Sequence, residues 1–366
     1  MRVRTSKAPI RIAAVGLGWV SQNRHLPAIA GSHGIYELAG VVDPSLERAR
    51  AVATRYRTRA AAARTLAEVP WLGEVDAVVV GAPPFAHAAL IEEAIAARKH
   101  VLTEKPFVMH VADGERLLES ALRARLVLAV VHNFQFSRSF KRLERLILER
   151  KLGEIRSVWA TQLSNPRRRL PEWYRDLPGG LFFDESPHLL YLIRRLLPDL
   201  SLLESRITPS AGGESTPAEV YAQFRNRRGQ TATLLMNFEA ALSEWHLIVT
   251  GEHGTADVDV FRDILTVLPN DGRHDAKDIL RTSYRAIRDH LVGTLASGTL
   301  HSLQRLDYGN REIVARFADA IHQTALQPDF IGSHEALAVR RLQEDILNAG
   351  MGHPRGASRL DRAAIP

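Results

Sequence analysis

Lysine is rare in this chain, and one lysine occupies a position where its chemistry could be used. The 366 residues include forty-two arginines but only six lysines, and Lys105 lies between Glu104 and Pro106, directly after an apolar run. The proline disfavours a helical conformation of the preceding residue, which predicts a defined loop. A desolvated ammonium group can lose its proton, whereas a guanidinium group cannot. Lys105 is therefore a candidate for proton transfer or for stabilising an alkoxide; an exposed lysine in a turn is the alternative.

A second group of polar side chains occurs in the segment GGLFFDESPHLLYLIRRLL, residues 179–197. Asp184 and His188 are four residues apart, so a helix over this segment would carry both side chains on one face. An imidazole takes up a proton near neutral pH, and a carboxylate can orient or polarise it. The two residues are therefore a candidate catalytic pair. The structural alternative is an aspartate near a helix start and a histidine packed against the next domain.

A glycine-rich turn ends the first apolar run of the chain. Residues 16–21, GLGWVS, follow the pattern G-x-G-x-x-(G/A/S) and precede a helical segment. Gly16 would permit a tight turn, and Gly18 would let the backbone approach a pyrophosphate bound by the N–H groups of the helix start. We expect the same turn to contribute Trp19 and Val20 to a cofactor site. Glycines that merely end a strand are the alternative.

Asp43 closes the second apolar run, about 25 residues after the glycine-rich turn. A carboxylate at this position can accept both hydroxyl groups of an adenosine ribose and would repel a 2′-phosphate. The residue therefore predicts NAD as the cofactor, with NADP as the alternative. An aspartate that only forms the turn before Pro44 is the structural alternative.

Two different patterns of apolar residues predict the helices and strands that must position these side chains. The first half alternates helical patterns with short apolar runs, which are expected as strands at 10–16, 37–43, 76–82, 100–105 and 126–132. Such alternation predicts an α/β fold, with an N-terminal Rossmann domain built on a doubly wound parallel sheet. Ligands bind at the carboxyl edge of a sheet of this type, where the glycine-rich turn, Asp43 and Lys105 all occur.

The rhythm changes after residue 131. A helix is expected over 139–153, strands at 155–164, 218–226, 230–240, 243–252 and 256–261, and helices near 275–296, 309–324 and 334–348. This order predicts a C-terminal α+β domain with an open, mostly antiparallel sheet. We expect a dinucleotide-binding domain at residues 1–131, a substrate-binding domain at 132–350 and a loose tail at 351–366.

A loop rich in arginine and aromatic residues, NPRRRLPEWYRD at 165–176, precedes the Gly-Gly turn. Trp173 and Tyr174 could pack on a sugar ring. Guanidinium groups pair bidentately with carboxylates and phosphates, so a secondary hypothesis is an anionic substrate such as a uronate or a nucleotide-linked sugar. The arginines that could form this clamp are Arg167, Arg168, Arg169 and Arg175. A solvated loop tethered by an aromatic residue is the alternative.

Composition excludes several classes of site. Cysteine is absent, which removes disulfide bonds, cysteine–zinc sites and thiol nucleophiles. No histidine pair has the spacing of a zinc site, so we predict no metal. Despite a formal net charge of +7, basic residues are interspersed with acidic ones, which disfavours nucleic-acid binding. Neither a signal peptide nor an apolar run of about 18 residues is evident, so we expect a cytoplasmic protein without a membrane span. Four histidines are interpreted as packing or capping groups: His25, His87, His100 and His132.

Several segments, taken in order, resemble the Gfo/Idh/MocA family, the glucose–fructose oxidoreductase and inositol dehydrogenase group. They are GLGWVSQNRHLPAI, VVD, GAPPFAH, RKHVLTEKP, HNFQFSRSF and GGLFFDESPHLLYLI, and the similarity extends over about residues 10–260. The resemblance implies a Rossmann domain followed by an open antiparallel sheet that commonly builds homodimers or homotetramers. It also implies reversible NAD(P)-linked oxidation of a secondary alcohol on a sugar, a cyclitol or a related compound.

The resemblance also implies roles for individual residues. Lys105 matches the catalytic lysine of the family, and Asp184 with His188 matches its pair in the substrate domain. The residues that match cofactor-contacting positions are Glu104, Ala82, Pro83 and Asn133.

The chain departs from the family pattern at four positions. Ser186 precedes Pro187 where D-x-G-x-H is common, Tyr191 replaces a frequent aspartate, and Gln135 and Arg138 replace an arginine and a proline. The reacting groups are intact, so dehydrogenase activity is expected, although no particular substrate is implied. We expect Lys105, Asp184 and His188 to contact the substrate together with Gln135, Trp173, Tyr174 and Arg175.

Two alternatives belong to other classes of mechanism. A Rossmann protein without catalysis could sense NAD(H) or a sugar and regulate a partner, since the fold alone does not assign an activity. Loss of the lysine or of the Asp–His pair would favour that hypothesis, and this chain retains both. An enzyme that keeps its cofactor bound and recycles it is the other alternative.

Overall fold

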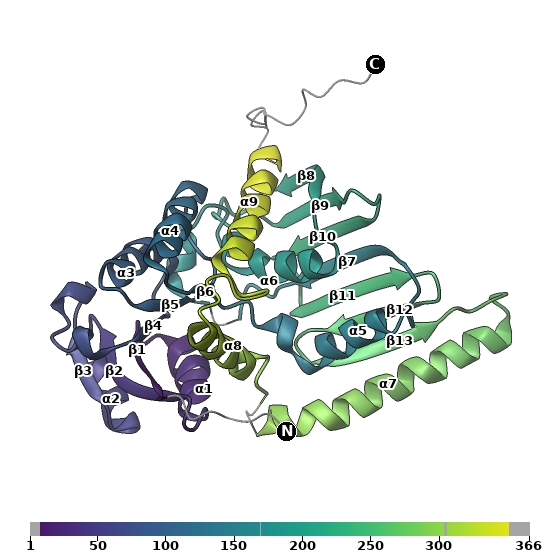
Figure 1. Ribbon diagram of the computed structural model, residues 1–366. Coiled ribbons are helices and arrows are strands. Elements are labelled where there is room, and N and C mark those ends of the chain that lie inside the picture. The colour runs from purple at the N-terminus through teal and green to yellow at the C-terminus, as the bar shows by residue number, and fades with distance from the viewer. Residues whose placement is uncertain (1–7, 169, 304–305, 351–366) are drawn as a thin grey trace, which may run out of the picture. The chain divides into compact units, whose positions relative to one another are not determined.

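The computed structural model describes residues 8–168, 170–303 and 306–350, which form two compact units (Figure 1). The first unit extends to Arg138 and also includes Leu303–Arg340, and the second consists of Ser139–Ser302 and the chain from Arg341 onward. Residues 303–340 thus pack with the first unit although they follow the second in the chain. The predicted domain limits stay predictions, and the loose tail expected at 351–366 lies outside the described residues.

The first unit contains the doubly wound parallel sheet that the sequence predicts. Its six strands lie in the order β3-β2-β1-β4-β5-β6, and every neighbouring pair is parallel. The strands are β1 (Ile10–Val15), β2 (Tyr36–Asp43), β3 (Arg59–Ala62), β4 (Ala77–Val80), β5 (His100–Thr103) and β6 (Leu128–Val130). Only β3 was not expected, because its sequence Arg-Ala-Ala-Ala has no β-branched or aromatic residue.

Helices cover both faces of this sheet, because successive side chains of a strand point to opposite faces. Val78 and Val80 of β4 pack with α3 and α4, whereas Ala77 and Val79 pack with α1, α2 and α8. The contribution of α8 to this second core explains why residues 303–340 belong to the first unit. The covering helices are α1 (Leu26–Ala30), α2 (Leu46–Tyr56), α3 (Pro84–Ala96), α4 (Val111–Ala124) and α8 (Asn310–Gln323).

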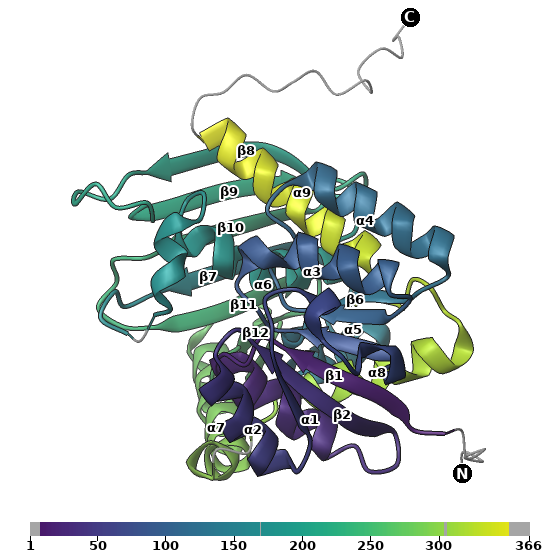
Figure 2. The same cartoon turned by 90° about the vertical axis from the view of Figure 1, so that its left-hand side faces the viewer.

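The second unit contains an open, mostly antiparallel sheet, as predicted. Its order is β13-β12-β11-β7-β10-β9-β8, and Figure 2 shows most of these strands side by side. Only the β7–β10 pair is parallel among the pairs described. The strands are β7 (Ile155–Leu163), β8 (Ser201–Thr208), β9 (Glu219–Arg225), β10 (Thr231–Asn237), β11 (Glu244–Gly251), β12 (Gly254–Asp259) and β13 (Ile264–Pro269).

Every second side chain is buried along β9, β10 and β11 and from Val158 onward in β7, while the side chains between them are partly or fully exposed. One face of the sheet therefore forms a core, to which the largely buried helix α6 (Leu181–Leu196) contributes. The other helices are α5 (Arg138–Leu148), α7 (Ala276–Ser302) and α9 (Ser333–Gly350), and α9 continues from the first unit into the second. Within the described residues, no helix is both long enough and apolar enough to span a bilayer.

Candidate functional site

The loops that follow β1 and β4 approach each other very closely at the carboxyl edge of the parallel sheet. Gly16 has a φ of +80°, and a Cβ atom on it would lie 2.6 Å from the backbone nitrogen of Ala82. Neither the conformation nor the space admits another residue. The structure therefore brings two segments predicted to contact a cofactor into backbone contact.

Asp43 connects this turn to the second strand. Its buried carboxylate accepts hydrogen bonds from the backbone N–H groups of Leu17 and Ser45, both at 2.9 Å. Nη1 of Arg48 lies 3.2 and 3.3 Å from the two carboxylate oxygens, and the Arg48 side chain is half exposed. Sequence reasoning did not consider Arg48, although its place one helical turn after the strand end is a usable signal. An arginine here bears on cofactor choice, because it can contact a 2′-phosphate.

The rest of the glycine-rich turn is partly open to solvent. Gly18 and Trp19 are exposed, and Val20 is partly exposed. The guanidinium group of Arg24 lies over the ring of Trp19 at 5.3 Å and over that of Tyr308 at 5.4 Å. Instead of the single helix expected after the turn, a short π-helical turn over Ser21–His25 leads into α1.

Ser21 occupies the third position of the motif, where a small residue is usual, and its side chain fits without loosening the packing around the turn. Its hydroxyl group donates a hydrogen bond to the carbonyl oxygen of Gly16. A Cβ atom on Gly81 would lie 2.2 Å from this hydroxyl oxygen. The space for the serine therefore comes from the missing side chain of Gly81.

Glu104 is buried directly after β5, and its two carboxylate oxygens contact His25 and the backbone of Lys105. Its Oε2 accepts a hydrogen bond from the backbone N–H of Lys105 at 3.0 Å, and its Oε1 lies 2.9 Å from Nε2 of buried His25. Burial alone would raise the pKa of Glu104, but the contact with His25 and the charge of Lys105 offset it, so that the pKa lies below its ordinary value. His25, interpreted from sequence as a packing or capping group, is thus paired with the predicted cofactor-side acid.

His87 bridges the loop after β4 and the loop that contains Lys105. Its fully buried ring lies with Nε2 2.9 Å from the carbonyl oxygen of Ala82 and with Nδ1 2.8 Å from that of Pro106. Burial lowers the pKa of His87, and the backbone carbonyls oppose this effect only in part. A neutral imidazole has one N–H, so it donates to one of the two carbonyls at a time. The ring therefore connects two loops that were predicted to face the cofactor.

Two buried amides also belong to the first unit. Asn133 donates from Nδ2 to the carbonyl oxygen of Tyr308 at 3.1 Å. Gln135 is 2% exposed and donates from Nε2 to the carbonyl oxygens of His132 and Phe330, both at 2.9 Å. Their predicted contacts, with the nicotinamide for Asn133 and with the substrate for Gln135, stay predictions.

In the second unit, a tight turn starts the helix that carries Asp184 and His188. Gly180 has a φ of +55°, and Thr216 occupies the space in which its Cβ would lie. The hydroxyl oxygen of Thr216 accepts a hydrogen bond from the N–H of Leu181 at 3.0 Å, which satisfies one free donor of the helix start. Asp184 and His188 lie four residues apart on α6, and both are partly buried.

The proline of the D-x-S-P-H segment is accommodated by a residue far away in the chain. Pro187 has no N–H, so the carbonyl oxygen of Phe183 lacks its helical donor. Gln343 of α9 donates from Nε2 to this oxygen at 2.7 Å and to the hydroxyl of Ser186 at 2.8 Å. The departure from the family pattern at Ser186 and Pro187 thus comes with its own hydrogen-bond partner.

Tyr191 contacts the predicted catalytic histidine. Its hydroxyl group lies 3.0 Å from Nδ1 of His188, and the two rings meet edge to face. The ring centroid of His188 lies 5.5 Å from that of Trp245. The phenol that replaces the frequent aspartate of the family therefore still contacts the imidazole and restricts its rotation.

The arginine-rich loop is attached to α6 by one of its arginines. Arg168 forms an ion pair with the buried carboxylate of Glu185, which also accepts a hydrogen bond from Gln162. Arg167 is exposed, and Arg169 lies outside the described residues. Arg168 is thus engaged within the unit, and sequence reasoning missed its partner Glu185.

The aromatic part of this loop lies near the start of α6. Tyr174 is buried, Trp173 is partly exposed, and the guanidinium group of exposed Arg175 lies 5.8 Å from the ring of Tyr174. Their predicted contacts with a substrate stay predictions. Lys105 belongs to the first unit and Asp184 with His188 to the second, so that their meeting at one site is likewise a prediction.

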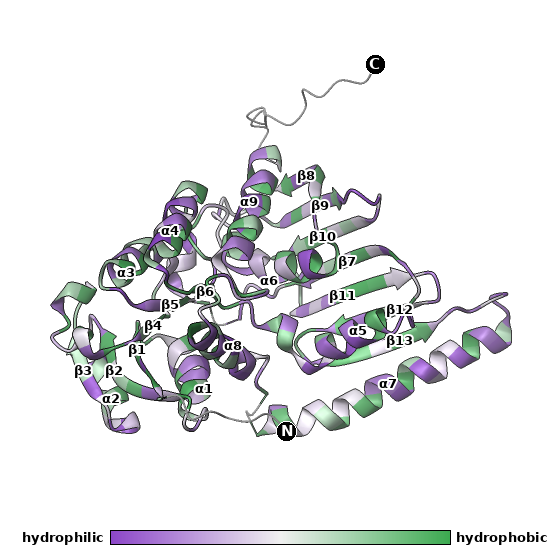
Figure 3. Ribbon diagram, viewed as in Figure 1, coloured by the Kyte–Doolittle hydropathy of each residue, from purple (hydrophilic) through white to green (hydrophobic). Residues whose placement is uncertain are grey.

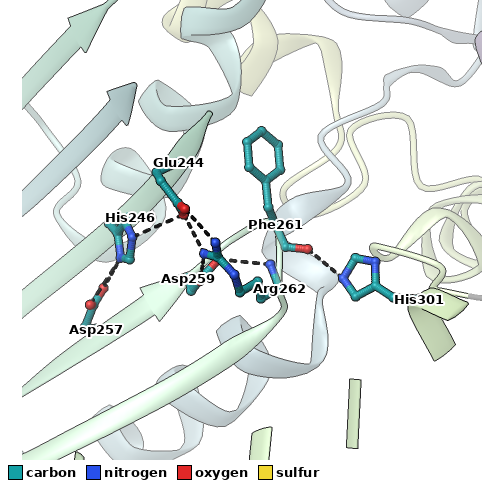
Figure 4. Close-up of polar contacts among 7 residues, drawn as sticks. All are labelled: Glu244, His246, Asp257, Asp259, Phe261, Arg262 and His301. Atoms are coloured by element: carbon teal, nitrogen blue, oxygen red, sulfur yellow. Dashed lines mark hydrogen bonds and ion pairs between the residues drawn. The ribbon is translucent and has the colours of Figure 1, made fainter. Parts of the chain in front are cut away.

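A separate polar cluster lies on the partly exposed side of the second sheet (Figure 4). Ligand atoms of Glu244, His246 and Asp259 lie within 4.8 Å of one another, as in a metal site. However, the guanidinium group of Arg262 contacts both carboxylates at 2.5 Å, so a cation would have to displace it. His246 pairs through Nδ1 with Asp257 at 3.0 Å. The absence of a metal stays a prediction.

The chain is similar to known proteins in both of its units. Residues 10–132 match a family model described as an oxidoreductase family with an NAD-binding Rossmann fold, and residues 140–257 match the GFO/IDH/MocA C-terminal domain. The dTDP-3,4-didehydro-2,6-dideoxy-alpha-D-glucose 3-reductase of Streptomyces violaceoruber is 34% identical over 189 residues, which cover 51% of this chain and 54% of the reductase. The match therefore spans about half the length of this curated relative.

Solved structures share the fold over nearly the whole chain. The WlbA dehydrogenase of Bordetella pertussis, in complex with NADH and UDP-GlcNAcA, has a TM-score of 0.73 at 18% identity and covers 94% of this chain and 98% of its own. A 3-ketoreductase of Actinomadura kijaniata, in complex with NADP and TDP-benzene, has a TM-score of 0.72 at 21% identity, with coverages of 93% and 98%. At these identities the likeness concerns the fold alone.

His87 is expected to stabilise the first unit. We expect His87→Leu to lower the free energy of unfolding by about 1–3 kcal/mol, because a buried carbonyl oxygen loses its hydrogen-bond donor. Chemical denaturation measures the effect, with His33→Leu at an exposed position as the matched control. Equal stability of the two variants would mean that the bridge contributes nothing.

The His246–Asp257 contact predicts a pH dependence of stability. The hydrogen bond that His246 donates to Asp257 raises the pKa of His246. The contribution of this contact to stability is therefore complete below the unfolded pKa of about 6.5 and is lost as the pH rises through the folded pKa. We expect the stability advantage of the wild type over Asp257→Asn to fall between pH 6 and pH 8.5. The fall should be on the order of 0.5 kcal/mol, because the pair is partly exposed. Denaturation at both pH values tests this, and a constant difference contradicts it.

Proposed function

Because this chain belongs to the Gfo/Idh/MocA family of oxidoreductases, we propose that it transfers a hydride between a nicotinamide cofactor and a sugar. The reacting group is a secondary alcohol or ketone of a sugar, a cyclitol or a sugar derivative. The observation that carries the proposal is the joined carboxyl edge of the parallel sheet, where Gly16 contacts Ala82 and His87 connects Ala82 to the loop of Lys105. Ligands of doubly wound sheets bind at this edge.

NAD is the proposed cofactor, and NADP is the alternative. The carboxylate of Asp43 favours a ribose with free hydroxyl groups, because it would repel a 2′-phosphate. Arg48 attracts such a phosphate, but its guanidinium group already lies against both carboxylate oxygens of Asp43. The fixed carboxylate therefore supports NAD. We propose Gly16, Gly18, Trp19, Val20, Asp43, Ala82, Pro83, Glu104, Lys105 and Asn133 as its contacts.

The residues of the chain supply position, charge and proton transfer to the proposed reaction. A bound nicotinamide would supply the hydride acceptor or donor. In the direction of oxidation, His188 takes the proton of the substrate hydroxyl, and Lys105 stabilises the developing alkoxide. Asp184 orients or polarises the imidazole, and Tyr191 restricts its rotation through the contact at Nδ1.

A neutral sugar or cyclitol is the proposed substrate, and an anionic sugar derivative is the second candidate. The exposed guanidinium groups of Arg167 and Arg175 support the second candidate, whereas Arg168 is already paired with Glu185. The Streptomyces relative is named for a dTDP-linked sugar, which also favours a nucleotide-linked substrate. We further propose a cytoplasmic homodimer or homotetramer.

A sensor of NAD(H) or of a sugar is the alternative function. The presence of Lys105, Asp184 and His188 favours the enzyme, because a sensor needs none of these groups for proton transfer. A retained, recycling cofactor is a variant of the enzyme hypothesis, and reduced-nicotinamide absorbance of the purified protein would reveal it.

A substrate panel tests the proposed reaction. We expect purified protein to form reduced cofactor with at least one polyol or sugar, and to do so faster with NAD than with NADP. The panel contains neutral sugars, cyclitols, uronates and nucleotide-linked sugars, and cofactor binding is measured in parallel. Faster turnover of neutral sugars than of their acidic analogues excludes the arginine clamp. Cofactor binding without any turnover favours the sensor.

A lysine variant tests the proposed mechanism. We expect Lys105→Met to lower kcat by roughly 10²–10⁴-fold, because the charge that stabilises the developing alkoxide is lost. The dissociation constant of NAD should change by less than about threefold, since the charge acts mainly in the transition state. Lys151→Met, at an exposed position, is the matched control. Wild-type turnover of Lys105→Met would remove the lysine from the mechanism.

A further inference from the structure

Helix α7 is attached to the second unit through a row of small and polar residues. Within this helix, Asp289 and Ser297 are the buried residues, and Gly293 lies between them at a spacing of four. Asp289 accepts a hydrogen bond from the N–H of Val267 in β13 at 3.1 Å. Gly293 lies so close to Ile264 that a Cβ atom would come within 2.7 Å of its side chain. The attached face thus contributes little apolar surface to the core.

Most of the large apolar residues of α7 are exposed. Figure 1 shows the helix along the β13 edge of the sheet, and Figure 3 shows hydrophobic residues recurring along its length. A surface helix of a globular protein normally buries its apolar stripe and exposes its polar face, and α7 does the reverse. The exposed apolar side chains, between 47% and 71% exposed, are Ile279, Leu280, Tyr284, Ile287, Leu291, Val292 and Leu295.

The exposed stripe is large enough for a protein interface. Seven large side chains exposed to this degree present on the order of 600 Å² of apolar surface, at the upper limit for a single patch on a monomer. One partner of a standard interface contributes about 800 Å². If the stripe and the polar residues around it are buried together, the area that one copy contributes therefore matches that of a stable interface.

We propose that the outward face of α7 packs against α7 of a second copy of this chain, antiparallel and about a two-fold axis. The spacing of the stripe is nearly symmetric about a point between residues 287 and 288. Antiparallel pairing about this point brings Leu280 opposite Leu295 of the partner subunit and Tyr284 opposite the partner's Leu291. Ile287 then lies next to the axis. Such an interface is isologous, because the same patch serves both copies.

The charges of α7 select the antiparallel orientation. Arg281, Arg285 and Arg288 lie in the N-terminal half, whereas residues 291–302 contain no charged Asp, Glu, Lys or Arg. In a parallel pair the arginines of both copies would face each other. In the antiparallel pair Arg281 lies beside the uncharged half of the partner helix, whose C-terminus carries the negative end of the helix dipole. Arg288 lies close to the axis, where its charge is balanced by Asp289 of the same chain at 2.6 Å. This proposal specifies where the subunits of the proposed homo-oligomer contact each other, and it does not depend on the proposed reaction.

Charged substitutions test the interface. We expect Ile287→Glu combined with Leu291→Glu to halve the mass of the full-length protein in sedimentation velocity, or to raise the dissociation constant of the dimer at least 100-fold. The circular dichroism spectrum and Tm should stay within error, because both residues are exposed in the single chain. Leu148→Glu, on an 83% exposed leucine of α5, is the matched control and should leave the mass unchanged. An unchanged mass of the double variant overturns the proposal.

Single cysteines test the orientation, since the wild-type chain has no cysteine. Ile287→Cys lies next to the axis and should form a disulfide-linked dimer on oxidation. Leu280→Cys alone should not, because antiparallel pairing separates its two copies by about 22 Å along the helix. Leu280→Cys with Leu295→Cys in one chain should cross-link again. Cross-linking of Leu280→Cys alone, a monomeric wild type, or binding to anionic lipid vesicles in place of self-association overturns the proposal.

Discussion

The backbone contact between Gly16 and Ala82 is the constraint on which the rest of the first unit's edge depends. It brings the turn after β1 against the loop after β4, with no room for a side chain between them. Asp43 fixes the same turn from the neighbouring strand, and His87 connects Ala82 to the loop of Lys105. A change at the glycine would therefore displace a lysine that lies two strands away in the sheet order. The side chains that hold this edge are buried and act on backbone groups, so the edge is organised before any ligand binds.

The sequence predicts the sheets well where a strand is buried on both faces or on alternate residues. The segments that form β1, β2, β4, β5 and β6 are rich in valine, isoleucine, leucine and alanine, so the local sequence alone indicates that they are buried. The strands β3, β8 and β13 were missed, and all three lie at the edges of their sheets. The alanine-rich β3 and the charged β8 differ little from loops, whereas the apolar run Ile-Leu-Thr-Val-Leu-Pro of β13 was a usable signal. The place of α8 on the first sheet could not be predicted, since its core partners lie almost 300 residues earlier in the chain.

The places of the candidate site residues in the fold were predictable from a single local motif, whereas contacts between two distant segments were not. Gly16 and Asp43 follow from the pattern at the ends of β1 and β2. The contacts of His25, His87 and Gln343 were missed because each partner lies far away in the sequence. A single histidine or glutamine forms no periodic pattern from which such a contact could be predicted. Tyr191 illustrates the same limit, since replacing an aspartate by a phenol kept the contact with the imidazole.

Ser21 and Gly81 share one volume, and this has an evolutionary consequence. The hydroxyl oxygen of Ser21 lies where a Cβ on Gly81 would be, and it is held there by its hydrogen bond to Gly16. Any lineage that gains a methyl group at position 81 must first, or at once, lose the hydroxyl group at position 21; alanine suffices there, because its Cβ would lie 3.5 Å from the new methyl group. Mutational paths through this pair are therefore ordered, and serine at the third position of the dinucleotide motif requires a glycine directly after the neighbouring strand β4.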